Sequence, residues 1–84
     1  CDFPDENLKA EIDLGKTQIA QLGAILEQMR EELEAYHPKA GPWYNKKVKE
    51  YNALVDQYNA LVADVQAKIA QYNVQAQAFN ECAQ

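Results

Sequence analysis

The repeat between positions 44 and 80 constrains the fold of this chain more than any other feature. An aromatic residue followed by asparagine recurs at positions 44, 51, 58, 72 and 79, and Val65-Gln66 occupies the remaining slot of the same seven-residue spacing. Four residues after the start of each pair comes a smaller apolar side chain, at Val48, Val55, Val62, Ile69 and Ala76. Apolar residues spaced alternately four and three apart over several heptads are typical of one long coiled-coil helix.

The first part of the chain carries the same spacing. Its apolar positions, with a glycine among them, are Leu8, Ile12, Gly15, Ile19, Leu22, Leu26, Met29, Leu33 and Tyr36. His37-Pro38 and Gly41-Pro42 interrupt the pattern, because the residue before proline avoids helical dihedrals whereas proline suits the first position of a new helix. The sequence predicts one all-α domain over residues 1–84, an antiparallel two-helix coiled-coil hairpin. Its helices are expected at about 5–36 and 42–82, with a turn at 37–41.

The two cysteines, Cys1 and Cys82, lie close to the two ends of the chain. A hairpin brings these ends together, so we expect a Cys1–Cys82 disulfide and an oxidising compartment. Two unpaired thiols are one alternative. A lipidated Cys1, as in mature bacterial lipoproteins, is another, although it leaves Cys82 without a partner. Because the chain begins with Cys1 rather than Met, we also expect that an upstream segment has been removed.

The heptads also predict how the two helices are aligned. Layering the first heptad position of one helix against the fourth of the other pairs residues whose numbers add to 84. Two of these pairs are Tyr36 with Val48 and Gly15 with Ile69. The same alignment places Cys1 opposite the step from Cys82 to Ala83, so the heptads and the cysteines predict one register.

The two flanks of the predicted seam differ in character. One flank carries Lys9, Lys16, Gly23 and Arg30 against a row of amides: Asn45, Asn52, Asn59, Gln66, Asn73 and Asn80. On the other flank we expect two ion pairs across the seam, Glu11–Lys68 and Glu32–Lys47.

Between these expected ion pairs lie Ile25, Leu54 and Leu61, which we call the apolar strip. The strip either covers the edge of the core or docks a helix of a second copy or of another protein. Trp43, beside the turn, is the second candidate contact residue.

The residue inventory favours a protein that performs no catalysis. The chain has one histidine (His37), no serine and one threonine, so we expect no catalytic residue, no metal site and no cofactor. The net charge of −5 argues against a nucleic-acid partner. No apolar run approaches the roughly 20 residues that span a bilayer. Membrane attachment is therefore expected only if Cys1 is lipidated.

The segment 51–62, YNALVDQYNALV, resembles Tyr-Asn heptad coiled coils of some bacterial secreted or envelope proteins. Some of those coiled coils precede a zinc-protease domain, but this chain has no His-Glu-x-x-His motif, so the resemblance implies no protease activity here. It implies a bacterial extracytoplasmic helical module. The size of the chain and its Pro38–Pro42 turn also resemble the needle subunits of type III secretion, although those lack terminal cysteines.

Taken together, these patterns predict a structural or accessory subunit of an extracytoplasmic assembly, whether periplasmic, in the cell envelope or secreted. It would bind a protein partner or a second copy through the apolar strip. One alternative is a small lipoprotein tethered through Cys1 that acts as a rigid spacer or adaptor. The other alternative is a self-assembling filament subunit.

Overall fold

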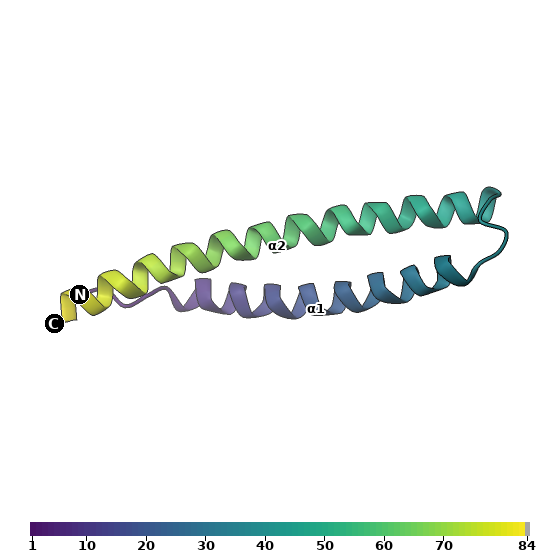
Figure 1. The fold of residues 1–84 in the computed structure, drawn as a ribbon. Coiled ribbons are helices and arrows are strands. Elements are labelled where there is room, and N and C mark those ends of the chain that lie inside the picture. The colour runs from purple at the N-terminus through teal and green to yellow at the C-terminus, as the bar shows by residue number, and fades with distance from the viewer. Residues whose placement is uncertain (84) are drawn as a thin grey trace.

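The computed structural model describes residues 1–83 and confirms the helical hairpin. It contains α1 (Glu6–Ala35) and α2 (Pro42–Ala83), which run antiparallel and are joined by a short turn (Figure 1). The hairpin is a rod with dimensions of 65 × 16 × 15 Å. Sequence had placed the helices at about 5–36 and 42–82, so each observed boundary lies within one residue of the expected one.

Local signals in the sequence set the ends of both helices. The Asp5 carboxylate accepts hydrogen bonds from the backbone N–H groups of Asn7 (2.9 Å) and Leu8 (3.3 Å), which would otherwise lack partners at the start of α1. After α1, Tyr36 has extended dihedrals and the peptide bond between His37 and Pro38 is cis. Gly41 has φ +102°, a conformation that side chains disfavour, and its carbonyl accepts from Asn45 N–H at 2.9 Å in the first turn of α2.

The core is a narrow seam between the helices. Among residues 1–83, the buried apolar side chains are Leu8, Ile12 and Val65, which lie in the half of the hairpin away from the turn. The half-buried side chains packed against this cluster are Ile19, Leu61, Ile69 and Tyr72. Gly15 is buried as well, and a methyl group added to it would overlap Val65 Cγ2. The two helices therefore pack in close contact where Gly15 meets Val65.

The predicted register is wrong by about one helical turn. Gly15 lies against Val65 rather than Ile69, and Tyr36 stacks on Tyr44 rather than lying opposite Val48. The observed alignment sets like heptad positions of the two helices against each other. Both alignments keep the apolar seams face to face, so the heptad pattern alone could not distinguish them.

The cysteines still meet because the first residues of the chain are extended. Asp5 N–H donates to Gln75 Oε1 at 2.8 Å, which fixes the alignment at the start of α1. From there, residues 1–5 run alongside the last turns of α2 (Figure 1). An extended residue advances about 3.3 Å but a helical residue only 1.5 Å, so four extended residues span the seven helical residues from Gln75 to Cys82. The agreement between heptads and cysteines in the predicted register was therefore coincidental.

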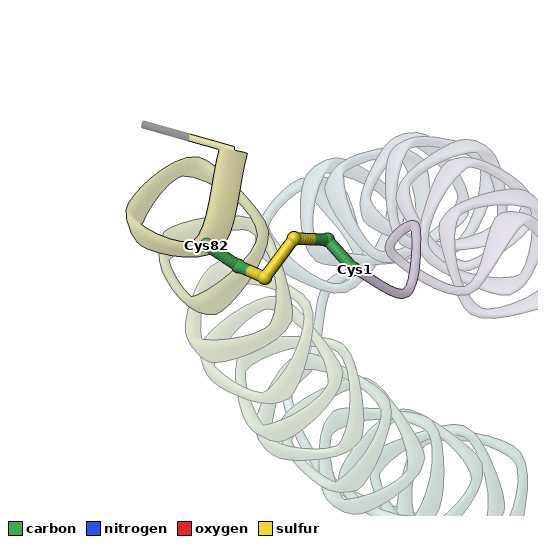
Figure 2. Close-up of a disulfide and its surroundings, with 2 residues drawn as sticks. All are labelled: Cys1 and Cys82. Carbon is green, nitrogen blue, oxygen red and sulfur yellow. A yellow bond between two sulfur atoms is a disulfide. The ribbon is translucent and has the colours of Figure 1, made fainter.

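The predicted disulfide is confirmed. Cys1 and Cys82 are bonded, with their Cα atoms 5.8 Å apart, and the bond joins the extended N-terminal segment to the last turns of α2 (Figure 2). A disulfide that closes the ends of a small chain indicates a non-reducing, extracytoplasmic setting. Within residues 1–83, neither helix is long and apolar enough to cross a membrane.

Candidate interaction surface

The apolar strip lies on one flank of the seam and is only partly covered by the hairpin itself. Ile25 on α1 is exposed, with 47% of its surface accessible, whereas Leu54 and Leu61 on α2 are half-buried. Leu61 also packs against the core cluster. Covering the edge of the core therefore explains the position of Leu61, but it does not explain the exposed side chain of Ile25.

One charged pair closes the strip at the end nearer the disulfide. Lys68 Nζ lies 3.8 Å from Glu11 Oε2 across the seam, as the sequence predicted, and 3.0 Å from Asp64 Oδ2 on its own helix. The hydrogen bond to Asp64 raises the pKa of Lys68, and the nearby Asp64 and Glu11 charges add to that effect. These groups are solvated, so the ion pairs add little to the stability of the fold.

The charged pair predicted at the other end of the strip is not formed. Lys47 Nζ instead lies 3.5 Å from Glu50 Oε2 on its own helix and 5.8 Å from the centre of the Trp43 ring. Glu32 forms no ion pair within the described part of the chain. Glu32 and Lys47 nevertheless line the same hollow, so they lie on the same flank.

The tip of the hairpin is an aromatic cluster. The Tyr36 ring lies 4.3 Å from that of Trp43 and 6.1 Å from that of Tyr44, measured between centroids. Trp43 keeps 44% of its surface exposed. Beside it is a hollow that also includes the side chains of Met29 and Leu33. Trp43 is therefore anchored on one side and accessible on the other, continuous with the strip flank.

The opposite end holds a contact that sequence reasoning missed. Phe3 stacks on Phe79 with ring centroids 4.7 Å apart, and Phe3 is 78% exposed. A second hollow lies beside this stack, lined by Asp2, Phe3, Asp5, Gln75 and Ala78. The sequence does contain a feature that predicts this contact. Phe79 continues the aromatic repeat of α2 past the level at which α1 begins, so only residues 1–5 are placed to pack against its ring.

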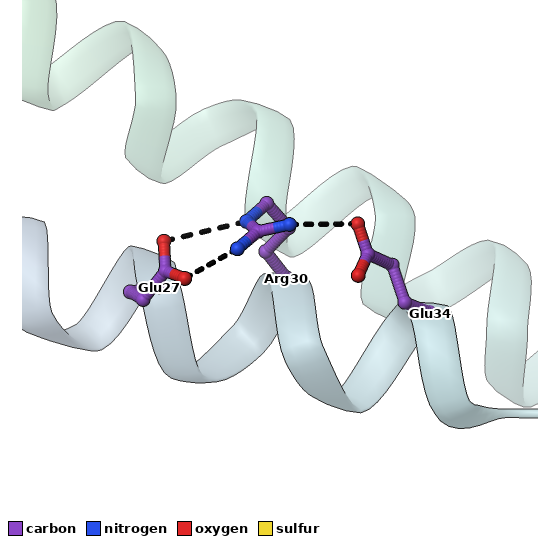
Figure 3. A network of polar contacts seen from close by, with 3 residues as sticks. All are labelled: Glu27, Arg30 and Glu34. Carbon is purple, nitrogen blue, oxygen red and sulfur yellow. Dashed lines mark hydrogen bonds and ion pairs between the residues drawn. The ribbon is translucent and has the colours of Figure 1, made fainter.

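Within residues 1–83, the basic side chains of the other flank form no hydrogen bond or ion pair across the seam. Arg30 bonds within α1 instead: its guanidinium donates to both oxygens of Glu27, and its Nη1 lies 2.7 Å from Glu34 Oε1 (Figure 3). The hydrogen bond from Arg30, together with its charge, lowers the pKa of the Glu27 carboxyl. The amide row from Asn45 to Asn80 is exposed along its whole length.

Within residues 1–83 the structure holds no cluster of three or more His, Cys, Asp or Glu side chains placed to bind a metal ion. The titrating groups with shifted pKa values are Glu27, Arg30 and Lys68, and each shift has an exposed ion pair as its main cause. The two hollows and the apolar strip are candidate contact surfaces, and the structure also exposes the isolated apolar side chains Leu14 and Val74. Comparison with protein-family models, with curated proteins and with solved structures finds no match for this chain.

Proposed function

We propose that the chain is a non-catalytic structural or accessory subunit of an extracytoplasmic assembly, and that it binds its partner through the apolar strip. The single observation that carries the proposal is the exposure of Ile25 beside Leu54 and Leu61. Apolar side chains that stay in contact with water contribute nothing to the stability of the hairpin, and their burial against another surface is favourable. A helix laid along the strip would remove them from water.

The disulfide supports the location of this assembly outside the cytoplasm, in the periplasm, the envelope or the extracellular medium. It also weighs against the lipoprotein alternative. An acyl-bearing thioether would require the Cys1 Sγ, which is bonded to Cys82. Trp43 extends the same flank to the tip and is the second contact residue in the proposal.

The proposal is tested by placing a photo-crosslinking residue at Ile25 in the exported protein of the producing cells. The matched control carries the same residue at Asn52, which is exposed on the opposite flank. Irradiation is expected to give adducts from position 25 and none from position 52, whether the adduct joins two copies or another protein. Equal labelling from both positions, or no adduct from position 25, contradicts the proposal.

Replacing Leu54 and Leu61 together by Glu should abolish the Ile25 adduct while circular dichroism still reports the helices. The matched change of Asn52 and Asn59 to Glu adds the same charges at the same spacing on the other flank. It is expected to leave the adduct intact. Retention of the adduct in the Leu54→Glu, Leu61→Glu variant would show that the strip is not the contact surface.

A further inference from the structure

We propose that the partner on the apolar strip is a second copy of this chain. The two hairpins lie side by side with their turns at the same end, related by a two-fold axis parallel to the rod; we call this the tip-to-tip dimer. The two hairpins would form a four-helix bundle with the strips facing each other. This inference rests on the proposed function, because it uses the same surface. It adds the identity of the partner and the direction in which it lies.

Two rows of side chains carry the argument. Heptad spacing puts Glu11, Gln18, Ile25 and Glu32 in one row on α1, and Lys68, Leu61, Leu54 and Lys47 in one row on α2. The Glu11–Lys68 contact fixes the two rows against each other. Both helices rise equally per residue, so each residue of the first row lies level with the corresponding residue of the second. Along the flank, the two outer levels are charged, the Ile25–Leu54 level is apolar, and the Gln18–Leu61 level pairs an amide with a leucine.

A tip-to-tip dimer repeats these matches between the copies. A two-fold axis along the rod sets α1 of one copy against α2 of the other at unchanged height. Glu11 then faces Lys68 of the second copy, and Glu32 faces Lys47. Between them, Ile25 faces Leu54 and Gln18 faces Leu61. At each charged level, going around the bundle, glutamate and lysine alternate, so each charge has only opposite charges beside it. Glu32, which lacks an ion pair within the described hairpin, gains a cation.

The opposite arrangement is disfavoured by the same rows. In a head-to-tail dimer centred on the strip, the second hairpin points in the opposite direction. This arrangement sets α1 against α1 and α2 against α2. It brings Lys68 to Lys47 of the second copy, and Glu11 to Glu32. Like charges would meet at both ends of the strip, which is how charged flanks exclude a wrong orientation. Charge complementarity therefore selects the tip-to-tip dimer.

The extent of the strip sets the strength to expect. The rows span 21 residues of α1, or about 30 Å, and the hairpin is 16 Å across. The buried area would be about 500 Å² per copy and about 1,000 Å² in total, the low end for a specific interface. We expect dissociation in the micromolar range, so the experiment must cover concentrations from about 1 μM to 1 mM.

The test uses two charge-reversed variants of the oxidised chain. One carries Glu32→Lys and the other carries Lys47→Glu, so only the charged level nearer the tip is changed. Each reversal changes the charge by two, so the net charge goes from −5 to −3 in the first variant and to −7 in the second. A head-to-tail heterodimer of these variants would still bring Glu11 of one chain to Glu32 of the other, and Lys68 of one chain to Lys47 of the other. Both variants stay negative, so overall attraction cannot join them. Sedimentation equilibrium measures each variant alone, the equimolar mixture and the unchanged chain, with circular dichroism to verify helicity.

We expect the unchanged chain to dimerise and each variant alone to associate at least about tenfold more weakly. The mixture of the Glu32→Lys and Lys47→Glu chains should recover most of the affinity as a heterodimer. Among positions 11, 32, 47 and 68, only the tip-to-tip arrangement then sets every lysine against a glutamate. Three results overturn the inference: a monomeric unchanged chain, variants that dimerise alone as well as in mixture, or open-ended polymers. The photo-crosslinking at Ile25 separates these outcomes from failure of the proposed function, since an adduct with another protein leaves that proposal standing.

Discussion

At the scale of single residues, the two helical glycines have opposite surroundings. A methyl group at Gly15 would overlap Val65 Cγ2, whereas a methyl group at Gly23 would lie 3.6 Å from Tyr58 Cε2, an ordinary contact. Both glycines lower helix propensity by about 1 kcal/mol relative to alanine. Gly15 is thus needed for its close packing against Val65, whereas no neighbouring atom requires a glycine at position 23.

The substitution Gly23→Ala should raise the free energy of unfolding by about 0.5–1 kcal/mol, because helix propensity improves at no steric cost. Gly15→Ala should lower it by about 1–3 kcal/mol, because the new methyl group forces the helices apart. Thermal and urea unfolding of the two variants measure the difference. In a chain that already carries Val65→Ala, the substitution Gly15→Ala should lower the free energy of unfolding by less, because the overlapping Val65 methyl group is gone. If Gly15→Ala stabilises the chain, the close approach of the helices is wrong.

At the scale of the helices, α2 is longer than α1, and its surplus length is covered by residues 1–5 rather than by helix. Asp5 joins the two regions: its side chain caps α1, and its backbone N–H bonds Gln75 on α2. The extended segment then places Phe3 on Phe79. The start of α1 is therefore held by both local and long-range contacts.

Asp5→Ala should reduce the free energy of unfolding by about 1 kcal/mol, because two N–H groups at the start of α1 lose their acceptor. Asp2→Ala removes the same charge three residues earlier, outside the helix, and is expected to change stability by less than about half of this amount. Urea titration followed by circular dichroism at 222 nm compares the two variants. Equal effects would mean that Asp5 acts through charge alone rather than as a cap.

The heptads predicted the elements but not their alignment. Spacings of four and three fix which side of each helix faces the seam, so the hairpin, the Glu11–Lys68 pair and the disulfide followed from the sequence. The register did not, because a slide of half a heptad keeps both seams facing each other. Val65 stands where the α2 repeat otherwise has an aromatic residue, and Gly15 stands where the α1 repeat otherwise has a larger side chain. Pairing these two small residues is the sequence feature that predicts the observed register.

The candidate surface was predictable to a similar degree. Heptad position placed Ile25, Leu54 and Leu61 on the flank that also carries the Glu11–Lys68 pair. Their exposure depended on how closely the helices pack, which residue type alone does not give. Lys47 turned to Glu50 and Trp43 because both lie within one turn on its own helix. Local partners of this kind compete with a cross-seam partner that must be reached over a longer distance.

At the scale of the whole molecule, the disulfide compensates for a small core. Within residues 1–83, three apolar side chains are buried in a rod 65 Å long. Chains with so little core usually depend on a covalent link or on a partner. The bond joins residues 81 positions apart, so it restricts almost the entire unfolded chain.

Reduction should therefore lower the melting temperature markedly, with a loss of stability of about 4 kcal/mol in the chain-entropy account. The variant with both Cys1 and Cys82 changed to serine should match the reduced chain and should not respond to a reducing agent. Thermal unfolding with and without reductant, followed by circular dichroism, makes the comparison. Unchanged melting on reduction would show that the bond contributes nothing to the fold.

Closure of the rod at its base also determines how it bears load. A pull that separates Cys1 from Cys82 is carried by the covalent S–S bond, so the seam is not opened from that end like a zipper. A single backbone cut in the turn would leave the two helices as one covalently joined piece. The resistance of the oxidised hairpin to force at its base is therefore set by a covalent bond and does not depend on the few side chains buried between the helices.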